Sequence, residues 1–70
     1  MTQAAATHRV ASTIRAELAR RRIPQNVLAE RLHLSQATVS RRLAGEYPFD
    51  VEELDIIAEM LEMTPSELIA

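Results

Sequence analysis

Apolar residues recur along this chain with the spacing of helices, and no stretch alternates as a strand would. In the first segment, Val10, Ile14 and Leu18 follow one another at intervals of four, which places them on one side of a helix that we expect to open near Thr7. Residues 1–6 are small or polar, and we expect them to be disordered. The pattern therefore predicts a disordered N-terminus over residues 1–6 and one helical domain over residues 7–70.

Two short helices are predicted next, joined by a tight turn. Pro24 suits the first position of the earlier helix, whose apolar side is formed by Val27, Leu28, Ala29 and Leu32. Ser35 is a good N-cap for the later helix, which we expect over residues 36–44 with Gly45 as its stop. Two helices joined by about three residues must cross steeply, and Ala29 is small enough for that crossing.

The last two helices are predicted to begin with capping boxes. Asp50 and Glu53 stand three residues apart, as do Thr64 and Glu67, so each side chain can bond the backbone amide of the other. Phe49 is expected to fill the core. The inward stripe of the fourth helix is predicted to consist of Val51, Leu54, Ile57, Ala58 and Leu61. The whole pattern predicts an all-α fold of five helices.

Length and composition restrict the function classes. Seventy residues make one small domain without a deep catalytic cleft. The absence of cysteine excludes a disulfide scaffold and a cysteine-ligated metal site. No apolar run approaches the roughly 20 residues of a membrane span, and the N-terminus lacks the charged start and apolar stretch of a signal peptide. We therefore expect a cytoplasmic protein.

Catalysis finds no support in the sequence. His33, Ser40 and Asp50 make only a nominal triad, because His33 and Ser40 flank a tight turn where no buried site would hold them. His8 and His33 are isolated in the sequence, so we expect no metal site. No glycine-rich phosphate loop is present, and we expect no cofactor and no enzymatic activity.

Charge is distributed unevenly along the chain, although the net charge is only −2. All eight basic residues are arginines between Arg9 and Arg42, and residues 1–45 carry a net charge of +6. Residues 46–70 contain eight acids and no base. This split predicts a basic face for an anionic partner and an acidic face turned away from it. Attraction between helices of opposite charge is the structural alternative.

The third helix is predicted to present a small, polar and cationic face. Its outer side, opposite Val39 and Leu43, holds Ala37, Ser40, Arg41 and Ala44, with Gln36 at the leading end. Small side chains let a helix enter a groove, and Gln and Arg can pair with adenine and guanine edges, respectively. The amides at the N-termini of the second and third helices can receive phosphates. This is the chemistry of a DNA-reading helix.

The segment from Gln25 to Ala44 resembles the helix-turn-helix of the phage-repressor-like (Cro/C1, or XRE) family of transcriptional regulators. That pattern has Gln at the start, Ala at the fifth position, Gly at the ninth and a β-branched residue at the fifteenth. These places hold Gln25, Ala29, His33 and Val39. The runs 40–43 (SRRL) and 48–51 (PFDV) are similar to the N-terminal domains of actinobacterial phage immunity repressors. The resemblance covers residues 10–69 and implies a lambda-repressor-like fold.

Two positions depart from the family pattern. His33 replaces the usual glycine of the turn, where a positive φ is expected and His is tolerated at modest cost. Ala37 replaces a polar reader, so it offers only a methyl contact, for example to thymine.

The resemblance implies roles for individual residues. Gln25 would grip a phosphate and brace Gln36, which would read a base. Ala37, Thr38, Ser40 and Arg41 would face the groove. We also expect DNA contacts from Arg42, Arg22 and Tyr47. Each of the three has a structural alternative. For Arg42 it is pairing with an acid or covering apolar surface, for Arg22 it is interaction with a helix dipole, and for Tyr47 it is packing on the loop.

The leading hypothesis is therefore sequence-specific binding of double-stranded DNA by a transcriptional repressor of phage immunity type, with residues 36–44 in the major groove. We expect a monomer that pairs on its operator, a dimerising segment beyond Ala70 being the other route to a homodimer. No membrane or small-molecule partner is implied. The alternative is a helical protein-interaction module, antitoxin-like or contacting polymerase or a sigma factor, which would use the acidic fourth helix. Charge reversal at Glu52, Asp55 and Glu59 would separate the two.

Overall fold

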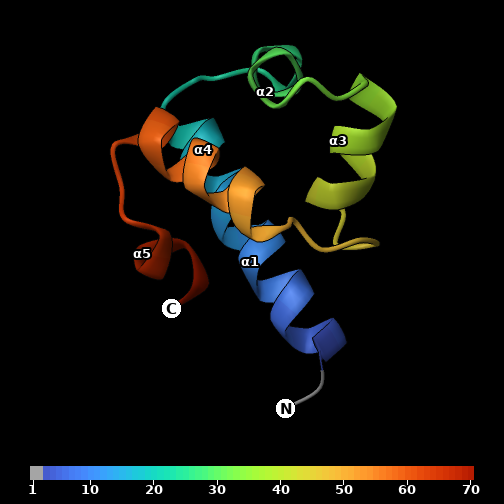
Figure 1. Ribbon diagram of the computed structural model, residues 1–70, viewed down its shortest axis with the longest axis vertical. Coiled ribbons are helices and arrows are strands. Elements are labelled where there is room, and N and C mark those ends of the chain that lie inside the picture. Colours follow the sequence, from blue (N-terminus) through green and yellow to red (C-terminus); the bar gives the residue numbers. More distant parts are fainter. Residues whose placement is uncertain (1–2) are drawn as a thin grey trace.

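The computed structural model describes residues 3–70, and within that range the regular elements are five helices and no strand. The helices are α1 (Gln3–Arg20), α2 (Gln25–Leu32), α3 (Gln36–Leu43), α4 (Val51–Leu61) and α5 (Pro65–Ile69), as shown in Figure 1. The predicted all-α fold of five helices is confirmed.

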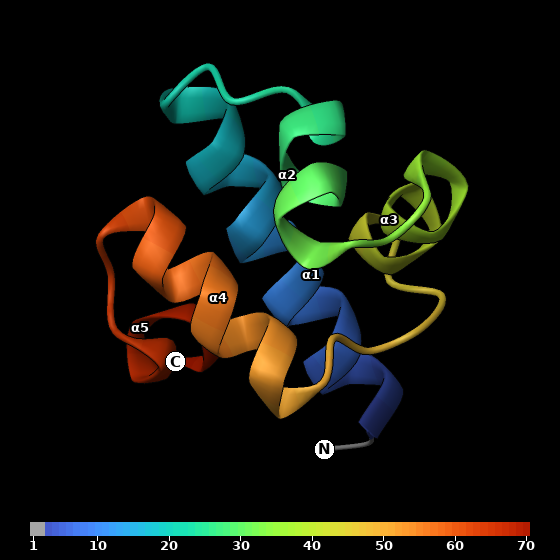
Figure 2. The same cartoon turned by 45° about the horizontal axis from the view of Figure 1, so that its top comes forward.

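The long helix α1 connects the two sides of the molecule. It packs against α3 and α5, while α2 packs against α3 and α4, and α4 packs against α5. In Figures 1 and 2, α3 lies on the side of the molecule opposite α5. Helix α3 of the helix-turn-helix segment and the acidic helix α5 therefore occupy different parts of the surface, whereas α4 packs against both α2 and α5.

The core is one cluster of side chains to which every helix contributes. Its buried members are Ile14, Leu18, Leu28, Ala29, Leu32, Val39, Leu43, Phe49, Ile57, Ala58, Leu61 and Leu68. Phe49 fills the core from the loop before α4, as expected.

Two apolar residues that we expected to face inward do not. Val51 is 82% exposed and Val27 is 40% exposed. Val51 is the first residue of α4, and at about 100° per residue it lies at the margin of the stripe that Ile57 and Leu61 centre. Glu53, on the other margin of that stripe, is buried instead.

The helix starts follow local chemistry, but α1 and α2 do not begin at the expected residues. Helix α1 begins at Gln3 and not near Thr7, because Ala4, Ala5 and Ala6 have the highest helix propensity. The expected disorder of residues 1–6 falls partly on residues 1–2, which lie outside the described residues; residues 3–6 are helical. The division of the chain at residue 7 stays a prediction.

Side chains cap three of the later helices as predicted. Ser35 accepts a hydrogen bond from the Thr38 amide. Asp50 and Thr64 each take part in a complete capping box. Pro24 is the N-cap of α2 and not its first residue, so α2 begins at Gln25, one residue later than expected.

Helices α1 to α4 each end at a residue with positive φ. These residues are Arg22, His33, Gly45 and Glu62, with φ of 56°, 57°, 83° and 57°. After α2, for example, the Leu34 amide donates to the Ala29 carbonyl at 3.0 Å and the His33 amide donates to the Glu30 carbonyl at 3.2 Å. The residues that follow the three non-glycine positions are apolar and pack against the core: Ile23, Leu34 and Met63. The chain accepts left-handed Arg, His and Glu because the next side chain packs against the core.

These left-handed residues lead to a stability prediction. Glu62→Gly should raise the free energy of unfolding by about 1 kcal/mol, because a side chain in this conformation costs roughly 1–2 kcal/mol and glycine avoids that cost. Urea unfolding measures the change. Glu62→Ala removes the same charge but keeps a Cβ, and it should give no gain. Equal effects of the two substitutions would show that φ at residue 62 is not strained.

Candidate nucleic-acid interface

The turn between α2 and α3 is built from three residues with different roles. His33, in the left-handed conformation, reverses the direction of the chain at the end of α2. Leu34 is half-buried and packs against the core. The Ser35 hydroxyl accepts from the Thr38 amide at 3.1 Å and donates to the Thr38 hydroxyl at 2.9 Å. The core contact of Leu34 and the Ser35 cap together fix the position at which α3 begins.

Helix α3 buries one side and exposes the other. Val39 and Leu43 are at most 2% exposed and join the core. Four residues on the other sides are exposed, and we call them the α3 face: Gln36, Ala37, Ser40 and Arg41. Thr38 is half-buried because its hydroxyl bonds the Ser35 cap. The sequence pattern therefore assigned the outward-facing residues of this helix correctly.

Most arginines of the basic half are engaged within the protein. Arg20 and Arg21 pair with Glu17, and Arg31 lies 3.9 Å from Glu59. Arg42 pairs with Glu53. Within residues 3–70, Arg22 and Arg41 are exposed and their side chains have no ion pair or hydrogen bond. The net charge of +6 thus reduces to a few cations that are available to a partner.

Residues 20–22 are three consecutive arginines, and Glu17 pairs with two of them, Arg20 and Arg21. The side-chain hydrogen bond from Arg21 holds the pKa of Glu17 below its ordinary value of 4.5, and the charge of Arg20 adds to this effect. Glu17 is therefore ionised near neutral pH and balances both neighbours. Arg22, whose backbone is left-handed, is the member of the run that stays unpaired.

Arg15 has a role that the sequence analysis missed. It lies on α1, and its guanidinium donates to the Leu43 carbonyl at the C-terminus of α3. The last carbonyls of a helix lack intrahelical partners and carry partial negative charge, so a cation suits this position. No sequence signal could identify this contact, because the two residues are 28 positions apart.

The N-terminus of α2 differs from those of the helices that follow it. No side chain caps it, whereas side chains cap α3, α4 and α5. Gln25, the first residue of α2, is exposed beside a cavity of about 300 Å³ that Arg15, Pro24 and Leu43 also line. The first amides of α2 are therefore available to an acceptor from outside the protein.

The remaining predicted site residues lie close to α3 in the chain. Tyr47, in the loop after α3, is 56% exposed. Arg42 is mostly buried and pairs with Glu53, which is one of the structural alternatives given for it above. The structure therefore presents Gln25, Arg22, Tyr47 and the α3 face to solvent and withdraws Arg42. Contact of each residue with DNA stays a prediction.

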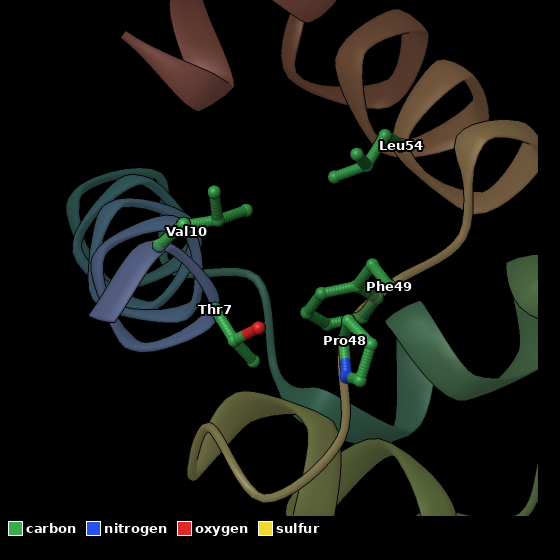
Figure 3. Close-up of a pocket in the computed structure, with 6 residues that line it drawn as sticks. Thr7, Val10, Pro48, Phe49 and Leu54 are labelled. Atoms are coloured by element: carbon green, nitrogen blue, oxygen red, sulfur yellow. The ribbon is translucent and has the colours of Figure 1, made fainter. Parts of the chain in front are cut away.

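A second cavity lies away from these residues. Figure 3 shows it between the first half of α1 and the loop before α4. Its volume is about 190 Å³, and it is lined by Ala6, Thr7, Val10, Pro48, Phe49 and Leu54. None of these side chains is charged at neutral pH, and Thr7 supplies the one polar side chain among them.

Residues 3–70 contain no cluster of three His, Cys, Asp or Glu side chains that could hold a metal ion. No helix in this part of the chain is both long and apolar enough to cross a membrane.

Comparison with known protein families places this chain beside a DNA-binding family. Residues 13–70 match a family model described as the Cro/C1-type HTH DNA-binding domain. No curated protein and no solved structure matched the chain. The matched range begins within α1 and contains the whole of α2, α3, α4 and α5.

The charge arrangement around Glu17 leads to a prediction of pH dependence. Because the pKa of Glu17 is lowered in the folded protein, its contribution to stability is present above pH 4.5 and is lost as the pH falls through the lowered pKa. A carboxyl titration by NMR should give a midpoint below 4.5 for Glu17. Arg21→Ala should raise this midpoint more than Arg20→Ala does, because the Arg21 hydrogen bond is the largest cause. An unchanged midpoint in Arg21→Ala would contradict the assignment.

Proposed function

The chain belongs to the family of Cro/C1-type HTH DNA-binding domains, and from this membership we propose that α3 enters the major groove of double-stranded DNA and reads its sequence. We further propose that the chain acts as a transcriptional repressor of phage immunity type. Gln36 would read a base, Arg41 would contact a base or phosphate, and Ala37, Thr38 and Ser40 would lie along the groove.

The observation that carries this proposal is the α3 face itself. It combines exposed side chains that are small or polar with one arginine that has no partner among the described residues. Small side chains at Ala37 and Ser40 allow the helix backbone to approach the base edges closely. Gln36 at the leading end can form a bidentate pair with adenine, and Arg41 can form one with guanine. A helix surface meant for solvent alone would need neither the small residues nor an uncompensated cation.

Contacts to the DNA backbone would flank this helix. Gln25 stands at the uncapped start of α2, where free amides and the positive end of the helix dipole favour a phosphate. Arg22 precedes α2 and Tyr47 follows α3, and both are exposed. Phosphate contacts of this kind fix the register of a protein on the duplex while base contacts supply specificity.

The distribution of acids supports the same orientation. Helix α4 exposes Glu52, Asp55 and Glu59, and α5 exposes Glu67. Helix α5 lies on the side of the molecule opposite α3 (Figure 2), and α4 packs against α5. Negative charge there would be repelled by phosphates and would turn the α3 face toward the duplex during encounter.

Binding as a pair is the usual arrangement for helix-turn-helix regulators. Two copies would occupy half-sites about 34–36 Å apart, so that both α3 helices enter the major groove on one side of the duplex. We propose that the free protein is a monomer and that two copies meet on their operator.

The proposal is tested first by selecting bound sequences from a random pool of duplex DNA. An enriched sequence with two related half-sites is the expected result, and selection of no sequence would contradict sequence-specific binding. Charge reversal at Glu52, Asp55 and Glu59 should leave this binding intact, because these side chains would face away from the duplex.

Arg41 provides the sharper test on the selected duplex. Arg41→Ala should weaken binding and reduce the slope of log affinity against log salt concentration by about one, because one phosphate or base contact by a cation is lost. Fluorescence anisotropy over a salt series measures both quantities. Arg31→Ala is the matched control, because Arg31 is another exposed arginine but faces Glu59 on α4. An unchanged affinity in Arg41→Ala would remove Arg41 from the interface.

A further inference from the structure

Arg42 and Glu53 form a mostly buried ion pair between the end of α3 and the start of α4. Their side chains are 21% and 11% exposed. The Arg42 Nη1 donates to Glu53 Oε1, and the same oxygen accepts the Asp50 amide at 2.9 Å. The Glu53 amide in turn donates to Asp50 Oδ1 at 2.8 Å. One carboxylate oxygen therefore joins the last turn of α3 to the capping box of α4.

The position of Arg42 on its helix gives this pair a mechanical consequence. Val39 and Leu43 attach α3 to the core from one side of the helix, where it packs against α1 and α2. At about 100° per residue, Arg42 lies roughly 60° to one side of Val39, and Leu43 lies roughly 40° to the other. A fixed contact on the flank of the helix, such as the Arg42–Glu53 pair, resists rotation of α3 about its axis. The direction of the α3 face then depends on the Arg42–Glu53 pair.

The environment of the pair also argues against release of Arg42 to a phosphate. If Arg42 turned outward, the Glu53 carboxylate would stay mostly buried with only the Asp50 amide to stabilise its charge. Breaking a buried pair by removing one partner is strongly unfavourable. Arg41, the preceding residue in the chain, is exposed and unpaired among the described residues and can contact DNA without this cost.

We infer that Arg42 is a positioning residue that orients the α3 face through Glu53 and does not itself contact DNA. The inference rests on the proposed function of α3 and replaces the expectation, drawn from the sequence, that Arg42 binds the duplex. It assigns to Glu53, an acid with no expected part in DNA binding, a role in the affinity of the domain for its operator.

Glu53→Gln distinguishes a positioning role from a phosphate contact by the sign of its effect. The substituted amide side chain would keep an oxygen for the Asp50 amide but would lose the charge that holds Arg42. If Arg42 positions α3, affinity for the selected duplex should fall by about tenfold, the scale of one base contact. If Arg42 binds phosphate, the same substitution removes a competing acid and should strengthen binding. Glu52→Gln is the matched control: it removes an exposed charge from the same turn of α4.

Arg42→Met and the double variant complete the test. Arg42→Met should also weaken binding about tenfold, with a salt slope equal to that of the unaltered protein, whereas loss of a phosphate contact would reduce the slope by about 0.9. The double variant should be no weaker than either single variant, because both remove the same interaction. If Arg42→Met does not fold, the sign of the Glu53→Gln effect decides the question alone.

Two further readouts separate orientation from stability. Circular dichroism establishes that each variant is folded at the temperature of the assay. Affinity for a scrambled duplex of the same composition should then stay within about twofold of the unaltered protein, so that the ratio of specific to nonspecific binding falls by nearly the full tenfold. A reduced salt slope in Arg42→Met, or unchanged or stronger binding by Glu53→Gln, would overturn the inference. Failure of the unaltered protein to bind any sequence would instead contradict the proposed function.

Discussion

Two buried side chains, Val39 and Leu43, attach the eight-residue helix α3 to the protein. A helix of this length is not stable alone in water, because too few hydrogen bonds form to offset nucleation. It persists because Ser35 caps its start, Arg15 binds the Leu43 carbonyl at its end, and Val39 and Leu43 join the core. Since these anchors occupy one side and the two ends, the α3 face is left free. The proposed function depends on this arrangement.

Ion pairs within the domain determine which of its arginines are available to a partner. A count of charges along the chain suggests a strongly basic half, but Glu17, Glu53 and Glu59 engage four of its arginines in ion pairs. What remains for a partner is local: Arg41 on the α3 face and Arg22 before α2. Ion pairs between different helices, such as Arg42 with Glu53, thus hold those helices together. The structural alternative for the charge split therefore holds for these four arginines, and a role of Arg22 and Arg41 toward an anionic partner stays a prediction.

Most of the fold could be predicted from the sequence because its signals are local. Caps at Ser35, Asp50 and Thr64 and the stop at Gly45 are short-range chemistry, and the structure has them all. The exposed position of Val51 was missed because the margin of an apolar stripe is buried only where another element lies against it. The left-handed residues Arg22 and Glu62 were missed because polar side chains there give no sign of the glycine-like backbone.

In the candidate site too, features set by local sequence could be predicted, and contacts between different elements could not. The outward face of α3 follows from helix periodicity once Val39 and Leu43 are assigned to the core, so Gln36, Ser40 and Arg41 were placed correctly. The Arg15–Leu43 and Arg42–Glu53 contacts join different elements, and their partners are known only when the helices are packed. Sequence alone therefore left three roles open for Arg42, namely a DNA contact, pairing with an acid and covering apolar surface, and the structure favours pairing with an acid.

If the proposed function is right, DNA meets this domain at the α3 face and not at the acidic helices. A titration of the ¹⁵N-labelled protein with the selected duplex, followed through the backbone amide resonances, locates the contact residue by residue. Shifts and broadening should concentrate in residues 22–26 and 35–47, with the exposed side of α4 and α5 little changed. Perturbations centred on residues 52–67, with residues 36–41 unaffected, would contradict binding through α3.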